Sequence, residues 1–183
     1  MAFLTGLLRH LVAVAVLPFV MAVVIPVWLS RRYPRSSGDA TTVSEFWPIV
    51  AVLAMVAGWC LLLIGLFLFV HSLRRFATDG KGTLAPWDPP RHLVVRGPYR
   101  FVRNPMISGV LIILIGEALV LQSLPHALWA LTFFAINAVY IPLLEEPQLR
   151  NRFGAEYIEY CKHVPRLLPR LRPWQPIPLN PLQ

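Results

Sequence analysis

The sequence has little charge and little cysteine. Only 14% of its 183 residues are charged and 56% are hydrophobic, a balance too apolar for an ordinary soluble domain. The two cysteines, Cys60 and Cys161, lie in segments of different expected depth and form neither a metal-ligand spacing nor a disulfide framework. The composition therefore excludes an ordinary soluble domain. It predicts one membrane domain over residues 1–183 that binds no metal.

Acidic residues are also scarce, and the basic ones are unevenly placed. The formal net charge is +8, from 17 Lys and Arg against 9 Asp and Glu. The basic residues are absent from the apolar runs and gather in the connecting segments and near the C-terminus. This distribution is expected beside an anionic membrane leaflet. We therefore predict membrane lipids, and not nucleic acid, as a partner.

Apolar runs of the length that spans a bilayer dominate the chain, since a helix needs about 20 such residues. The predicted membrane helices cover residues 7–29, 46–71, 106–122 and 126–144. The first run resembles both a cleaved signal peptide and a retained helix; its length and the lack of a small-residue cleavage site favour retention. Pro18 and Pro26 within it are tolerated in membrane helices. The fold class is predicted to be all-α, an integral membrane bundle with about four transmembrane helices.

Three segments outside these runs have their own patterns. Glycines and prolines interrupt residues 72–105, which predicts a long structured cytoplasmic loop. Residues 145–163 are amphipathic, with apolar side chains at four-residue steps and Glu156, Glu159 and Lys162 facing elsewhere; this predicts an interfacial helix. The apolar positions are Leu149, Phe153, Tyr157 and Cys161. The tail, 164–183, is basic and proline-rich, which argues against a continuous helix.

The basic residues also predict the orientation, because cytoplasmic loops of membrane proteins are enriched in Lys and Arg. Four crossings with the N-terminus inside leave only Arg31, Arg32 and Arg35 on the outer side. The opposite orientation would reverse this bias. Both termini are therefore predicted to be cytoplasmic.

Polar groups that could carry chemistry occur in one loop and at one helix start, on the same predicted membrane face. The loop is 91–106, which contains four arginines and several backbone donors, and the helix start is Glu145-Glu146-Pro147. Together they could hold a zwitterionic ligand against the bilayer.

At these residues the sequence resembles the isoprenylcysteine carboxyl methyltransferase and phospholipid methyltransferase-like membrane enzymes. The resemblance extends from Arg91 to Arg170, and the order of its motifs makes it specific. The motifs are Gly97 to Pro105, Glu145-Glu146 with Leu149, Phe153 to Tyr160, and Val164-Pro165-Arg166 through Pro169-Arg170.

The resemblance implies an S-adenosylmethionine-dependent methyltransferase that acts at the cytoplasmic membrane face. Its acceptor would be hydrophobic or lipid-linked, with a carboxylate, amine or thiol to be methylated. The cofactor-binding residues carried over by position are His92, Leu93, Val94, Gly97, Tyr99, Arg103, Asn104, Pro105, Glu145 and Glu146. Methyl transfer is a direct displacement that needs alignment and exclusion of water, so no catalytic residue is assigned.

Two departures from the family pattern bear on the substrate. Many members have His where this chain has Asn104, and Tyr where it has Ile107. The eukaryotic prenylcysteine enzymes carry an Arg shortly before the glutamates, whereas residues 137–144 contain no basic residue here. The departures argue against prenylcysteine as the acceptor and leave methyl transfer in place.

Simpler interpretations exist for each residue taken alone. Arg100 and Arg103 could anchor lipid headgroups, Tyr99 could be an interfacial aromatic residue, and the twin acids could be a favourable first helical turn. Glu117 lies deep in an apolar run, where a structural role is favoured. Two other functions stay open: a nicotinamide-dependent membrane reductase of the sterol-reductase type and a non-catalytic membrane module. The joint order of the motifs favours methyl transfer.

Overall fold

The computed structural model describes residues 15–34, 47–80 and 92–175. These residues form helices and irregular segments, with no strand among them, so the all-α prediction is confirmed for the described part of the chain. The elements are η1 (Ala15–Val24), α2 (Ile25–Arg32), α3 (Trp47–Asp79), η3 (Gly97–Arg100), α4 (Pro105–Leu121), α5 (Leu124–Tyr140), η4 (Ile141–Glu145) and α6 (Glu146–His163). The predictions for residues 7–14 and 176–183 lie outside the described residues.

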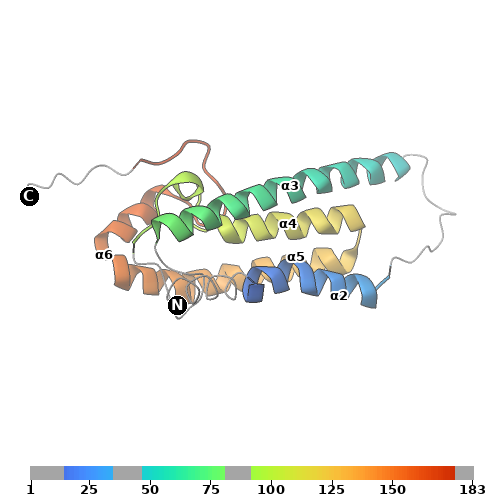
Figure 1. Ribbon diagram of the computed structural model, residues 1–183, viewed down its shortest axis with the longest axis horizontal. Helices are drawn as coiled ribbons and strands as arrows, with labels where there is room; N and C mark the ends of the chain where they lie inside the picture. The colour runs from blue at the N-terminus through green and yellow to red at the C-terminus, as the bar shows by residue number, and fades with distance from the viewer. Residues whose placement is uncertain (1–14, 35–46, 81–91, 176–183) are drawn as a thin grey trace, which may run out of the picture.

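The helices lie along one common direction (Figure 1). Helix α3 packs on α4, α4 on α5, and α2 on α5. Helix α5 continues through η4 into α6, which bends at Gly154, where the backbone has φ 54° and ψ −129°. That conformation is strained for residues with a side chain, so glycine allows the chain to turn there. The second half of α6 is thereby directed toward the loop at the end of α3 (Figure 1).

Two pairs of glycines bring α3 and α4 into backbone contact. A Cβ atom built on Gly58 would lie 2.8 Å from the carbonyl oxygen of Gly116, and one on Gly65 would lie 2.8 Å from that of Gly109. No side chain fits at these separations. Close approach through small residues is a common packing mode of membrane helices, where the apolar solvent gives no hydrophobic drive to association.

A second contact joins α2 to the start of α5 through buried His126. Its Nε2 atom lies 3.1 Å from the carbonyl oxygen of Pro26 and 3.2 Å from Ser30 Oγ. One turn later, Trp129 donates a hydrogen bond of 3.0 Å to the carbonyl of Met21. Proline removes backbone hydrogen bonds from its own helix. Here Trp129 of α5 supplies a donor to one backbone carbonyl, that of Met21, in the proline-containing stretch.

The outer faces of the bundle are apolar and exposed. Among the described residues, two helical runs are long and apolar enough to cross a membrane by length and composition, Pro48–Asp79 and Leu124–His163, and Pro105–Leu121 is apolar but shorter. Only 11% and 17% of the most apolar windows of the two long runs are buried, whereas the core helix of a soluble protein would be largely covered. Exposed apolar surface on this scale fits a membrane domain.

Helix α3 is longer than the sequence predicted. Residues 72–79, assigned to the cytoplasmic loop, are helical. The reason is local: this stretch contains no glycine or proline, and the residues that break regular structure begin at Gly80. Asp79 is therefore carried to the tip of a rigid helix.

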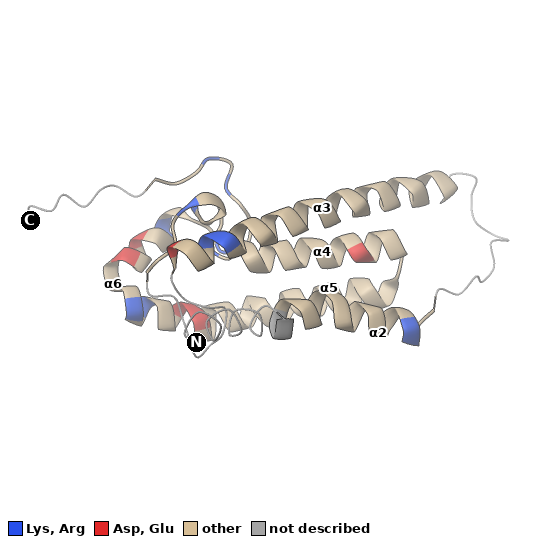
Figure 2. Cartoon of the chain, in the orientation of Figure 1, with Lys and Arg blue, Asp and Glu red and all other residues tan. Residues whose placement is uncertain are grey.

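Charged residues gather at the α6 end of the bundle, and long stretches of the helices are without charge (Figure 2). At the opposite end, the last turn of α2 carries Arg31 and Arg32. The described charges are thus concentrated at the end where the loop, α6 and the tail meet.

Candidate active site

The tail after α6 is fastened to the loop that precedes α4. Residues 164–175 are not helical, as predicted for this proline-rich segment. Backbone hydrogen bonds of 2.8–3.2 Å join it to the loop. They run from Arg103 to Pro165, from Asn104 to Arg166, from Arg170 to Phe101 and from Trp174 to Arg100. The tail and the loop therefore act as one structural unit at this end of the bundle.

Glu146 ties that unit to α6. Its side chain is only 4% exposed and accepts hydrogen bonds from Arg166, at 2.6 Å from Nε and 3.1 Å from Nη2. Arg103 lies 3.0 Å away, and the exposed Arg150 lies 3.8 Å away. Burial alone would raise the pKa of Glu146, but the hydrogen bond from Arg166 and the charges of Arg103, Arg166 and Arg150 hold the pKa below its usual value. The carboxylate is thus ionised and fully engaged within the protein.

Glu145 has a different environment from its neighbour. It takes part in none of the ion pairs found among the described residues. Burial, and secondarily the charge of Glu146, raises the pKa of Glu145 to about 7. A carboxyl group with such a pKa changes protonation near neutral pH, which is a property of functional sites as well as of some structural ones.

Tyr99 lies close to Glu145 and is buried. Its pKa is raised by burial, then by Tyr160 and by the charge of Glu145. Tyr160 donates a hydrogen bond of 2.6 Å to the carbonyl oxygen of Tyr99. The Tyr99 hydroxyl itself has no hydrogen-bond partner among the described residues. A buried polar group without a partner is costly, so this hydroxyl points to a ligand or a water molecule.

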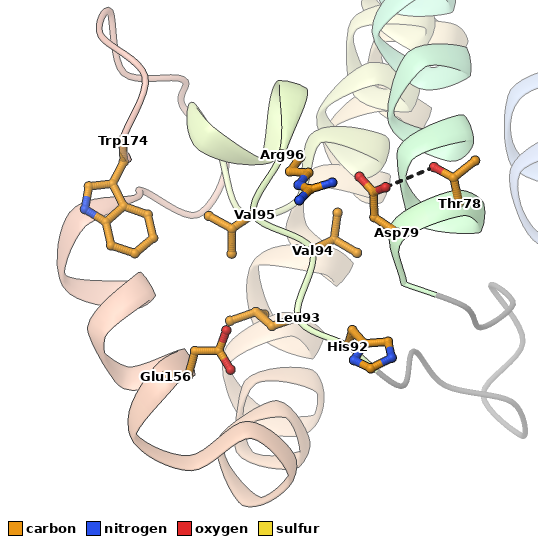
Figure 3. Close-up of a pocket in the computed structure, with 9 residues that line it drawn as sticks. All are labelled: Thr78, Asp79, His92, Leu93, Val94, Val95, Arg96, Glu156 and Trp174. Carbon is orange, nitrogen blue, oxygen red and sulfur yellow. Dashed lines mark hydrogen bonds between the residues drawn. The ribbon is translucent and has the colours of Figure 1, made fainter. Parts of the chain in front are cut away.

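A cavity of about 480 Å³ opens beside the loop (Figure 3). Its volume is within the roughly 300–1,000 Å³ typical of ligand pockets. Four segments converge on it: the tip of α3, the loop at 92–96, the second half of α6 and the tail. The lining residues are Thr78, Asp79, His92, Leu93, Val94, Val95, Arg96, Glu156 and Trp174.

The cavity combines opposite charges with an aromatic surface. Figure 3 shows Asp79 and Arg96 on one side and Glu156 and Trp174 on the other. Carboxylates accept hydrogen bonds from hydroxyl or ammonium groups, arginine pairs with carboxylates, and an aromatic face attracts a cation. Such a lining suits a zwitterionic ligand with hydroxyl groups. Among the described residues there is no group of three His, Cys, Asp or Glu side chains that could hold a metal ion.

An apolar cluster supports the cavity from behind. Tyr157, Tyr160 and Val164 are buried together, and Leu93 and Val95 of the loop pack against them. Their partly buried neighbours include Leu149, Phe153, Cys161 and Trp174. The apolar face of α6 predicted from the four-residue steps is therefore real, and it packs in part on the loop and the tail.

The predicted cofactor residues divide into three groups in the structure. His92, Leu93 and Val94 line the cavity. Tyr99 is buried, and the partly buried Glu145 lies close enough to raise its pKa. Tyr160 links Tyr99 to the cavity, because it donates a hydrogen bond to the Tyr99 carbonyl and its ring lies 5.8 Å from that of Trp174. The remaining residues have structural contacts, described next.

The third group of predicted residues makes structural contacts that fix the loop in place. Its members are Gly97, Arg103, Asn104, Pro105 and Glu146. Gly97 has φ +57°, and a Cβ there would lie 3.2 Å from His71 Nε2 of α3. Arg103 and Glu146 form an ion pair of 3.0 Å with each other. Asn104 bonds to the tail, and Pro105 is the buried first residue of α4.

Six residues of the cavity were not among the predicted site residues: Thr78, Asp79, Val95, Arg96, Glu156 and Trp174. Asp79 was assigned to an irregular loop because the end of α3 was placed too early. Glu156 was expected to face away from the apolar side of a straight helix, and the bend at Gly154 changes its direction. Trp174 reaches the cavity because backbone hydrogen bonds hold the tail against the loop, and no local sequence pattern indicates these bonds.

The fold and the cavity describe a membrane protein with a candidate ligand cavity at one end of a helical bundle. A family model of phospholipid methyltransferases matches residues 53–156. The chain belongs to the phospholipid methyltransferase family, so the resemblance recognised in the sequence is confirmed.

Two curated relatives are methyltransferases. The chain is 35% identical over 81 residues to protein-S-isoprenylcysteine O-methyltransferase B of Arabidopsis thaliana, covering 42% of this chain and 39% of that protein. It is 32% identical over 140 residues to methanethiol S-methyltransferase of Pseudomonas deceptionensis, covering 74% of this chain and 47% of that protein. The matches span less than half the length of each relative. No solved structure matches the chain.

Proposed function

We propose that this protein is an S-adenosylmethionine-dependent methyltransferase that acts at the cytoplasmic membrane face on a hydrophobic or lipid-linked acceptor. The observation that carries the proposal is the cavity at the polar end of an apolar bundle, lined by Asp79, Glu156, Arg96 and Trp174. Membership of a methyltransferase family supports the reaction class. Bound S-adenosylmethionine would supply a methyl group made electrophilic by a positively charged sulfur.

The residues present fit this cofactor. Asp79 or Glu156 would accept hydrogen bonds from the ribose hydroxyls, and Arg96 would pair with the carboxylate. Trp174 offers a flat apolar face for the adenine ring. Glu145, whose neighbour Glu146 is held by arginines, is the member of the twin acids that we assign to the ammonium group, beside the unpartnered Tyr99 hydroxyl.

The acceptor is proposed to enter from the bilayer, because the helices beside the site expose apolar side chains. A carboxylate acceptor would need a cation to hold it, and the arginines nearest the twin acids are engaged by Glu146. A thiol or an amine needs a proton removed before it can attack. The thiol named in the bacterial relative is therefore the first acceptor class to test.

Binding of the cofactor product in detergent tests the proposal directly. Purified protein should bind S-adenosylhomocysteine with micromolar affinity by calorimetry, and Asp79→Asn and Glu145→Gln should each weaken binding by about tenfold, the loss of one charged hydrogen bond. Glu159→Gln, which removes an exposed acid of α6 outside the cavity, is the matched control and should leave binding unchanged. Binding of reduced nicotinamide dinucleotide phosphate alone would indicate a reductase instead, and binding of neither would indicate a non-catalytic module.

Methyl transfer should be measured with a labelled donor and three acceptors in parallel: a small thiol, a lipid-linked amine and a prenylcysteine analogue. We expect transfer to the thiol and little to the prenylcysteine analogue. Transfer to the prenylcysteine analogue alone would contradict the acceptor argument while preserving the methyltransferase assignment.

A further inference from the structure

The segment 167–172 of the tail is fixed at the depth where the membrane helix α4 begins. Ser108, in the first turn of α4, donates a hydrogen bond of 3.1 Å from Oγ to the carbonyl oxygen of Leu167. On the far side of the segment, Arg170 is held by its backbone bond to Phe101 and by a side-chain bond of 2.7 Å to the carbonyl of His163. The start of an apolar membrane helix marks the boundary of the bilayer. The tail therefore passes this boundary at a set height.

Two leucines of this segment point away from the protein. Leu168 is 81% exposed and Leu171 is 98% exposed. A single exposed leucine is ordinary, but here the backbone bonds on either side prevent the pair from folding back onto the bundle. Figure 1 shows the tail arching outward past the ends of α3 and α4. Both side chains are thus held out at the level of the membrane surface.

The charges around the two leucines all have the same sign. Residues 164–175 contain Arg166, Arg170 and Arg172 and no acidic residue. Arg166 is paired with Glu146, whereas Arg172 is exposed. Leucine interleaved with arginine is the composition of segments that lie in the interface of an anionic membrane, with the apolar groups below the headgroups and the cations among the phosphates.

We infer that residues 167–172 form a membrane hook that docks on the anionic lipids of the bilayer in which the protein sits. Leu168 and Leu171 enter the boundary between headgroups and acyl chains. Arg170 and Arg172 contact lipid phosphates. The same tail carries Arg166 to Glu146 and Trp174 to the cavity, so the docked lipid surface holds the wall of the candidate site in place. The inference does not depend on which reaction the protein catalyses.

Site-specific photocrosslinking in nanodiscs tests the hook. A diazirine amino acid replaces Leu171, or Leu168 as a second position, in the full chain reconstituted with mixed zwitterionic and anionic phospholipids. We expect lipid adducts by mass spectrometry at both positions and few at Glu159, an exposed α6 residue used as the control. Adducts at 168 and 171 no more frequent than at 159 would overturn the inference.

The anionic component is tested with the same probe. Arg172→Gln should reduce the preference of the position-171 adduct for anionic over zwitterionic lipid by about fivefold, as expected for one cation at a charged surface. Arg152→Gln removes an exposed charge of α6 and should leave the ratio unchanged. An unchanged ratio in Arg172→Gln would show that the segment does not select anionic lipid. Both measurements are independent of methyl transfer, so their failure is distinguishable from failure of the proposed function.

Discussion

The two adjacent acids at the start of α6 have opposite roles, which their sequence positions do not reveal. Glu146 is surrounded by three arginines, from the loop, the tail and its own helix. Glu145 has none of them, and burial keeps its carboxyl group protonated to a higher pH. The sequence could predict that an acid pair faces an arginine-rich loop. It could not predict which of the two acids forms ion pairs with the arginines, because this depends on where the tail packs against α6.

Replacing Glu146 should destabilise the folded protein strongly. Glu146→Gln leaves Arg103 and Arg166 without their buried counter-charge, a change that costs about 3 kcal/mol in comparable buried pairs. Thermal unfolding in detergent should show a clear loss relative to the wild type. The exposed pair of Glu159 with Lys162 gives the control, and Glu159→Gln should change stability by less than about 1 kcal/mol. Equal effects of the two substitutions would argue against a stabilising role for the ion pairs of Glu146 with Arg103 and Arg166.

Replacing Glu145 should have an effect that depends on pH. The pKa of Glu145 in the folded protein is about 7, against a usual value of 4.5. A raised carboxyl pKa means that the protonated form favours folding, so this contribution is present at low pH and is lost as the pH rises through 7. The neutral Glu145→Gln side chain does not titrate. The melting temperature of the variant relative to the wild type should therefore increase from pH 5 to pH 8. A difference that stays constant over this range would show that Glu145 has an ordinary pKa.

At the level of the helices, most of the architecture was predictable from apolar run length. The helix ends were less so, because they depend on where breakers act and on partners far away in the sequence. Helix α3 continued past the apolar run to Asp79 because a helix can extend into water until a glycine interrupts it. The bend of α6 at Gly154 was missed because a single glycine is compatible with a straight helix, and only the backbone angles show the turn.

The glycine contacts between α3 and α4 should be intolerant of even one methyl group. Gly65→Ala places a Cβ 2.8 Å from a carbonyl oxygen of the facing backbone, so the helices must separate, at a cost of about 1–3 kcal/mol. The check is thermal unfolding in detergent. Ala57→Leu adds a larger group on an exposed face of the same helix and should have little effect. If Gly65→Ala were as stable as the wild type, the close approach of the two helices would be wrong.

For the whole molecule, the charge distribution makes the orientation testable. Four crossings would place the α6 end, with its arginines, in the cytoplasm, and the end of α2 on the other side. A fluorescent reporter fused after residue 183 should fold and fluoresce in a bacterial host, and an alkaline phosphatase inserted after residue 38 should be active. An inactive phosphatase together with a dark C-terminal reporter would reverse the orientation. Two reporters on the same side would change the number of crossings.

Only part of the candidate site could be predicted, because some of its residues lie in a recognisable sequence pattern and others do not. His92, Leu93 and Val94 lie in the conspicuous broken loop, so their place beside the cavity could be expected. Asp79, Glu156 and Trp174 reach the cavity only through the length of α3, the bend of α6 and the return of the tail. These are properties of the assembled molecule, and no local sequence pattern contains them.

Helix α3 also sets the height of the site above the hydrophobic layer. Its 33 residues give a rod of about 50 Å, whereas the hydrocarbon core is about 30 Å thick. The surplus must protrude or be taken up by tilt. A thicker bilayer would therefore draw Asp79 and the mouth of the cavity closer to the acyl chains, and a thinner one would lift them into water. Membrane thickness thus sets the distance between the acyl chains and the cavity, which the proposed hydrophobic acceptor would have to cross.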